Sequence, residues 1–88
     1  MTAAVRVLVA DDQATVREGL VALLGLLPGV EVVAEAADGT SALAQVTEHA
    51  PDVVVMDLHM PGMDGFEVAQ RIRTQERSQH TPIIFITA

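Results

Sequence analysis

Residues 53–65 read VVVMDLHMPGMDG, and this stretch shows both a strand of the fold and the place where that strand ends. The apolar run VVVM has the β-branched composition of a strand that is buried on both faces. Asp57 stops the run, and a loop with Pro61 and two glycines follows, which is typical of a turn. Gly62 and Gly65 permit turn conformations with positive φ there. The stretch therefore predicts a buried strand with a carboxylate at its tip.

Three further apolar runs have the same character. They are short, rich in Val and Ile, and nearly continuous, as expected for parallel strands covered on both faces. The predicted strands are VRVLVA (5–10), VEVVAEA (30–36), DVVVMD (52–57) and PIIFITA (82–88).

Helical periodicity fills the intervals between these strands, because apolar residues recur there every three or four positions. The first helix has two alternative N-caps, Asp12 or a capping box of Thr15 and Glu18, and Asp38-Gly39 is interpreted as a turn. The predicted helices are 14–27 (apolar Val16, Leu20, Leu23, Leu24, Leu27), 40–50 (Leu43, Val46, Ala50) and 65–76 (Phe66, Ala69, Ile72).

The order of these elements is βαβαβαβ, without an internal repeat or a linker. Strands that alternate with helices predict an open parallel sheet with right-handed crossovers. At 88 residues the chain has room for one domain with a modest core. The sequence therefore predicts a single α/β domain over residues 1–88.

Composition narrows the classes of partner. Half of the residues are hydrophobic but only two are aromatic, so the core must be aliphatic. The net charge is −7, and such an acidic chain repels phosphate backbones, so we expect no direct binding of nucleic acid. Without cysteine, a signal peptide or an apolar run of about 20 residues, the sequence favours a cytoplasmic protein and no membrane association.

Two of the predicted strands end in acidic residues. The strand 5–10 runs into Asp11 and Asp12, and the strand 52–57 ends at Asp57. In open parallel sheets, ligands bind beyond the carboxyl ends of the strands, where the winding direction reverses. If these two strands are neighbours, three carboxylates meet at one edge of the sheet.

Such a cluster needs compensation by protons or a cation. Two like charges about 4 Å apart repel by roughly 4 kcal/mol at an effective dielectric constant of 20. Because the ligands are oxygens, the cluster favours the hard cation Mg²⁺ over Zn²⁺. A solvent-accessible carboxylate beside Mg²⁺ is also a candidate nucleophile toward phosphorus, and Asp57 is placed to act as one.

Taken together, these motifs resemble the receiver domain of two-component response regulators. The resemblance implies a flavodoxin-like fold, (βα)3β, with strand order 2-1-3-4. Residues 5–65 are most similar to receivers of LuxR-type regulators. Residues 71–88 look more like receivers of hybrid histidine kinases and related multidomain proteins, so regulation of transcription would be inherited only by analogy. The matching segments are VLVADD (7–12), AADG (36–39), DVVVMDLHMPGMDGFE (52–67) and PIIFITA (82–88).

The resemblance also implies a role for each site residue. Asp57 would accept a phosphoryl group from a histidine kinase or a phosphotransfer protein, in a regulatory domain rather than an enzyme. Asp12 and Asp57 would bind Mg²⁺ directly, and Asp11 would assist through water. The backbone carbonyl of His59 would be the third protein ligand, and the hydroxyl of Thr87 would bond the phosphoryl oxygen.

The chain departs from the family pattern after its fourth strand. A complete receiver continues with a helix, a strand and a helix, and carries a lysine after the fifth strand, whereas this chain contains no lysine. We therefore expect a C-terminally incomplete receiver in which 82–88 is an apolar sheet edge. Such edges recruit another chain, so we expect a homo-oligomer or a domain-swapped dimer.

Two other functions stay open. One is a receiver fragment that self-associates and is not phosphorylated. The other is an enzyme, a Mg²⁺-dependent phosphohydrolase with an aspartyl nucleophile. The enzyme is less favoured, because those related sites usually place a second acid two residues after the nucleophile, where this chain has His59.

Overall fold

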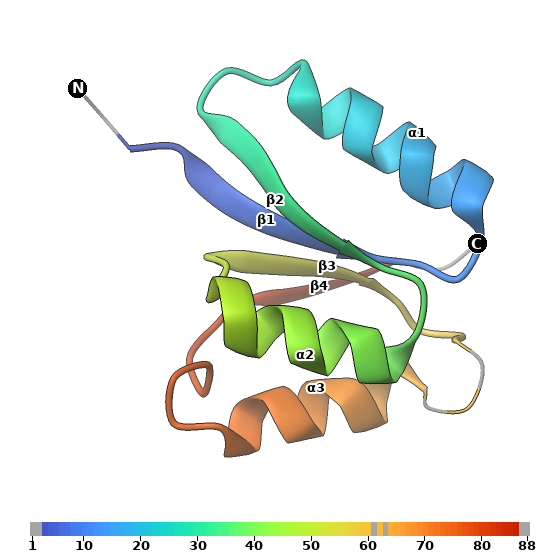
Figure 1. Cartoon of the computed structure of the whole chain (residues 1–88), viewed down its shortest axis with the longest axis vertical. Helices are drawn as coiled ribbons and strands as arrows, with labels where there is room; N and C mark the ends of the chain where they lie inside the picture. Colours follow the sequence, from blue (N-terminus) through green and yellow to red (C-terminus); the bar gives the residue numbers. More distant parts are fainter. Residues whose placement is uncertain (1–2, 61, 63, 87–88) are drawn as a thin grey trace.

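Four parallel strands form one sheet, and three helices connect them in the predicted alternation (Figure 1). The computed structural model describes residues 3–60, 62 and 64–86. Its elements are β1 (Val5–Ala10), α1 (Ala14–Gly25), β2 (Val30–Ala36), α2 (Gly39–His49), β3 (Val53–Asp57), α3 (Gly65–Thr74) and β4 (Ile83–Ile86).

The strand order is β2-β1-β3-β4, which confirms the predicted order and the flavodoxin-like class. β1 is paired with β2 on one side and with β3 on the other, and both pairs are parallel. The chain therefore reverses its winding direction at β1. The space beyond the carboxyl ends of β1 and β3 is the point at which sheets of this kind bind ligands.

The two faces of the sheet are covered unequally. In Figure 1, α1 lies alone on one face, and α2 and α3 lie side by side on the other. Alternate residues of each strand point to opposite faces, so one set packs beneath α2 and α3. The buried core there consists of Leu8, Ala10, Ala36, Ala42, Val46, Val54, Met56, Met60, Val68 and Ile72.

The face under α1 is much less closed. No residue of α1 is buried, although apolar residues recur along it at helical spacing. Leu23 is 64% exposed, and Leu26, in the turn that follows, is 80% exposed. A single helix cannot cover four strands, because its contact strip is about 10 Å wide. Ile84 of β4 lies on the same open side and is 53% exposed.

The helix ends differ from the prediction in instructive ways. α1 begins after Gln13, and no side chain caps it, so both proposed caps for this helix are wrong. Asp38, interpreted as a turn residue, caps α2 by accepting a hydrogen bond from the backbone of Ser41 at 2.7 Å. The predicted helix ends at 27, 50 and 76 lie one or two residues too far along the chain.

Among residues 3–60, 62 and 64–86, no helix has the length and apolar character needed to cross a bilayer.

Ala50 ends α2 in the left-handed conformation, with φ of 44° and ψ of 61°. This conformation is unfavourable for a residue with a Cβ by about 1–2 kcal/mol. Ala50→Gly should therefore raise the free energy of unfolding by about 1 kcal/mol, after allowing for the greater freedom of glycine in the unfolded chain. Urea denaturation followed by circular dichroism measures this change.

The matched control is Ala44→Gly, at an exposed position inside the same helix. There, glycine should lower the free energy of unfolding by about 1 kcal/mol. Two changes of the same sign would contradict the conformational explanation for Ala50.

Candidate functional site

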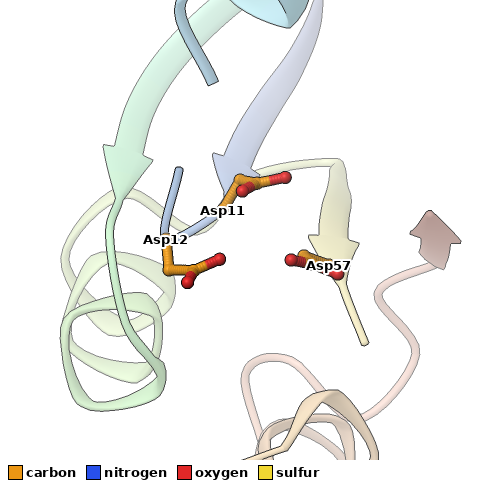
Figure 2. A group of neighbouring side chains, drawn as sticks. All are labelled: Asp11, Asp12 and Asp57. Carbon is orange, nitrogen blue, oxygen red and sulfur yellow. The ribbon is translucent and has the colours of Figure 1, made fainter. Parts of the chain in front are cut away.

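The acidic residues predicted to meet do so at the carboxyl ends of β1 and β3. The backbone N–H of Asp11 donates to the carbonyl of Ala36 at 3.0 Å, which ties the end of β1 to the end of β2. Asp11 and Asp57 are only 3% and 6% exposed, and Asp12 is half-buried. Figure 2 shows the three side chains around the space between the two strand ends.

The three carboxylates are close enough to share one ion. Each contributes an oxygen, and these oxygens all lie within 4.8 Å of one another. Oxygens that bind a common Mg²⁺ at about 2.1 Å are separated by about 3–4 Å, so small side-chain adjustments close the site. The predicted convergence of Asp11, Asp12 and Asp57 is confirmed.

Backbone hydrogen bonds orient two of the carboxylates. Oδ1 of Asp11 accepts from the N–H of Gln13 at 2.9 Å, and Oδ1 of Asp57 accepts from the N–H of His59 at 3.1 Å. Both bonds reach two residues ahead, which is the pattern of an Asx turn. Each bond engages one oxygen, and among the described residues no hydrogen bond holds the second oxygen of either group.

No cationic side chain neutralises the cluster within the described residues. The ion pairs found there join Arg17 to Glu35 and Arg71 to Glu67, and neither includes a carboxylate of the cluster. Carboxylates buried side by side repel strongly unless a cation or protons compensate them. A set of hard oxygen donors with this uncompensated charge fits Mg²⁺.

The loop after β3 brings the N-terminus of α3 against the site. Asp64 caps this helix by accepting from the N–H of Glu67 at 2.8 Å. Gly62 uses the conformational freedom of glycine, with φ of +79°, whereas Gly65 does not have positive φ. Gly65 is needed for a different reason. A Cβ at this position would lie 2.9 Å from the carbonyl oxygen of Asp57 and 2.9 Å from Cα of Leu58.

Several predicted residues are not tested by these contacts. Thr87 lies outside the described residues, as does Pro61 in the loop after β3. His59 is described, and its side chain is exposed, but its contact with the cluster is through its N–H. The role of its carbonyl stays a prediction.

Two further residues near the site were not identified as functional from the sequence. Gly65 was assigned only to a turn, and Arg17 was not assigned a role. The guanidinium of Arg17 donates to the carbonyl of Asp11 at 2.7 Å. No sequence spacing signals such a bond, because it depends on how α1 is placed against the strand ends.

Comparison with known proteins agrees with this architecture. The sequence model that describes the family of response regulator receiver domains matches residues 7–88 of this chain. The chain belongs to this family. Receiver domains are regulatory, and they typically bind Mg²⁺ at an acidic pocket; the structure has an aspartate cluster at the ends of β1 and β3.

Curated relatives contain this receiver as part of a longer chain. The probable transcriptional regulatory protein NarL of Mycobacterium tuberculosis is 46% identical over 84 residues, which are 96% of this chain and 38% of the relative. The protein-glutamate methylesterase/protein-glutamine glutaminase 2 of Anaeromyxobacter dehalogenans is 48% identical over 84 residues, 96% of this chain and 24% of the relative.

A solved structure shows the same fold. The signal receiver domain of NarL from Mycobacterium tuberculosis superposes with a TM-score of 0.89 at 42% identity, over 99% of this chain and 68% of that one. The fold of the receiver is therefore shared over nearly the whole chain.

Replacement of Gly65 tests the close approach of α3 to the pocket. Gly65→Ala should lower the free energy of unfolding by about 1–2 kcal/mol, since overpacking a tight contact costs more than alanine gains in helix propensity. Urea denaturation measures the effect. Gly19→Ala is the control, because a Cβ there would meet no atom within 4 Å other than those of its chain neighbours and of the backbone of α1 itself. That change should be neutral or stabilising, by up to about 1 kcal/mol.

Proposed function

We propose that the chain is a phospho-accepting receiver in which Asp57 takes a phosphoryl group from the phosphohistidine of a histidine kinase or a phosphotransfer protein. The single observation that carries the proposal is the meeting of Asp11, Asp12 and Asp57 within 4.8 Å. Asp57 stands at the tip of its strand with one oxygen held by the N–H of His59 and the other available for attack.

The proposed phosphoryl transfer is a nucleophilic substitution at phosphorus. A carboxylate oxygen of Asp57 forms a bond to phosphorus while the P–N bond of the phosphohistidine breaks, and the electron pair leaves with the imidazole. The product is an acyl phosphate on Asp57. The hydrogen bond from the N–H of His59 fixes the rotamer of Asp57. The second carboxylate oxygen is thereby held in one orientation toward the incoming phosphorus atom.

We propose that the residues at the ends of β1 and β3 also bind Mg²⁺. Asp12 and Asp57 would hold Mg²⁺ directly, Asp11 would act through water, and the carbonyl of His59 would complete the protein ligands. When bound, Mg²⁺ neutralises charge on the incoming phosphoryl group. We assign the hydroxyl of Thr87 to the phosphoryl oxygen by resemblance alone.

The output lies beyond the receiver. The same segment matches a transcriptional regulator and a methylesterase, so the activity of those whole proteins is not set by the matched residues. By analogy with NarL, we propose regulation of transcription as the output of a longer protein, with residues 1–88 forming one receiver unit. We also propose a cytoplasmic location, which the lack of cysteine in the sequence favours.

A second candidate function is a self-associating receiver fragment that is not phosphorylated. It is favoured by the β4 side of the sheet, where β4 pairs only with β3 among the described strands and has no charged residue. Ile84 is exposed on the face that α1 leaves open. Unpaired apolar edges of this kind associate with a second copy.

Phosphorylation of the purified chain distinguishes the two. Incubation with Mg²⁺ and acetyl phosphate should add one phosphoryl group, detected by intact mass, and Asp57→Asn should abolish it because the amide is not a nucleophile toward phosphorus. Asp38→Asn is the control, since asparagine caps α2 as well as aspartate does. Labelling that survives Asp57→Asn would refute the assignment, and a folded chain without labelling would favour the fragment.

Self-association has its own test. Sedimentation should show a mass that rises with concentration, and Ile84→Lys should shift the chain toward the monomer by placing a charge on the apolar edge. Leu26→Lys adds the same charge at another highly exposed position and should leave the association unchanged. A monomer at every concentration would rule out the proposed contact.

A further inference from the structure

We infer that Arg17 is a positioning residue for the acidic pocket, which it serves by tying the loop that carries Asp11 and Asp12 to the end of β2. The inference rests on the proposed function, because it takes this pocket to be the Mg²⁺ site. It concerns a residue that contacts none of the three carboxylates through a hydrogen bond or an ion pair in the described structure.

Arg17 joins three elements. It stands in the second turn of α1, and its Nη1 donates to the carbonyl of Asp11 at 2.7 Å. Its Nε lies 3.4 Å from Oε1 of Glu35 on β2. The side chain of Arg17 is 19% exposed and that of Glu35 is 47% exposed, so the arginine is the more buried partner of this ion pair.

The backbone of Arg17 holds the other end of the same loop. Its N–H donates to the carbonyl of Gln13 at 2.9 Å, while its side chain bonds Asp11. The loop residues 11–13 are therefore bracketed by one residue. Asp12, the half-buried carboxylate of the cluster, lies between these two attachment points.

The loop needs this attachment because α1 contributes little else to hold it. The N-cap Gln13 makes no side-chain hydrogen bond, and no residue of α1 is buried. α2 and α3, in contrast, are each capped by an aspartate and anchored by buried residues. The bond from Arg17 to the carbonyl of Asp11 therefore gives this loop a side-chain attachment to α1.

The ion pair with Glu35 also keeps the positive charge of Arg17 away from the three carboxylates of the pocket. An arginine beside three acidic residues would occupy the place of a cation if it turned toward them. Glu35 engages the guanidinium at β2, and no ion pair joins Arg17 to Asp11, Asp12 or Asp57 in the described structure. The positive charge is thereby held outside the cluster.

A positioning role and a purely electrostatic role predict opposite changes in Mg²⁺ affinity when Arg17 is replaced by a neutral residue. Removing a positive charge near an anionic pocket should strengthen the binding of a cation if charge alone matters. If Arg17 positions the loop, its removal should weaken binding, because residues that orient metal ligands typically contribute about 10–100-fold in metal affinity. The sign of the change therefore decides between the two roles.

The experiment is a calorimetric titration of the full chain with MgCl₂ alone. Arg17→Gln should raise the Kd for Mg²⁺ by about 10-fold. Arg71→Gln is the matched control, since it removes the same charge from an exposed pair with Glu67 and should leave the Kd within about twofold. Circular dichroism at the same temperature verifies that each variant is folded.

Arg17→Lys provides a second variant that keeps the charge and is expected to fold even if Arg17→Gln does not. An ammonium group cannot hold two partners in the fixed geometry of a guanidinium, so the Kd should rise by about threefold. Electrostatics alone predicts no change for this variant. Binding that is unchanged or tighter in Arg17→Lys, or tighter in a folded Arg17→Gln, would overturn the inference.

The wild-type titration separates this inference from the proposed function. Failure of the wild-type chain to bind Mg²⁺ would contradict the proposed site itself. Binding by the wild type with an unaltered Kd in both Arg17 variants would leave the proposed function intact and remove only the role of Arg17.

Discussion

The parallel pairing of β1 with β3 brings the acidic residues together. Its register places Leu8 opposite Val54 and Ala10 opposite Met56, and the residue that follows Ala10 and the residue that follows Met56 are both aspartates. Parallel strands end on the same side of a sheet, so Asp11 and Asp57 arrive at one edge. A slip of one residue would turn the buried residues of a strand to the other face, so core packing also fixes the position of the carboxylates.

Aspartates at this edge of the molecule have two roles, and the two groups differ in how far their side chains are exposed to solvent. Asp38 and Asp64 are exposed and cap helices, where a carboxylate that accepts backbone N–H bonds stabilises the first turn. Asp11 and Asp57 also accept backbone N–H bonds, but they are almost fully buried beside a third carboxylate. The capping residues give local stability, whereas the buried ones create a charge that a divalent cation can balance.

The two faces of the sheet have different consequences for function. The face under α2 and α3 holds the closed core and supports the strand ends that form the pocket. The face under α1 keeps apolar residues exposed, among them Leu23 and Ile84. The proposed phosphoryl transfer and the proposed self-association would therefore use different parts of the fold. Because α1 has no buried residue, its contribution to the pocket depends on polar contacts such as that of Arg17.

The order of the elements, the parallel sheet and the three carboxylates could be predicted from the sequence, because apolar periodicity and strand-end aspartates are local patterns. The sequence did not determine the caps of α1, the reason for Gly65 or the contacts of Arg17. A glycine is needed at position 65 because α3 lies close to the end of β3. Arg17 reaches Glu35 because α1 is placed beside β2. Distances between segments remote in the chain arise only when the helices pack on the sheet, so tertiary structure alone decided them.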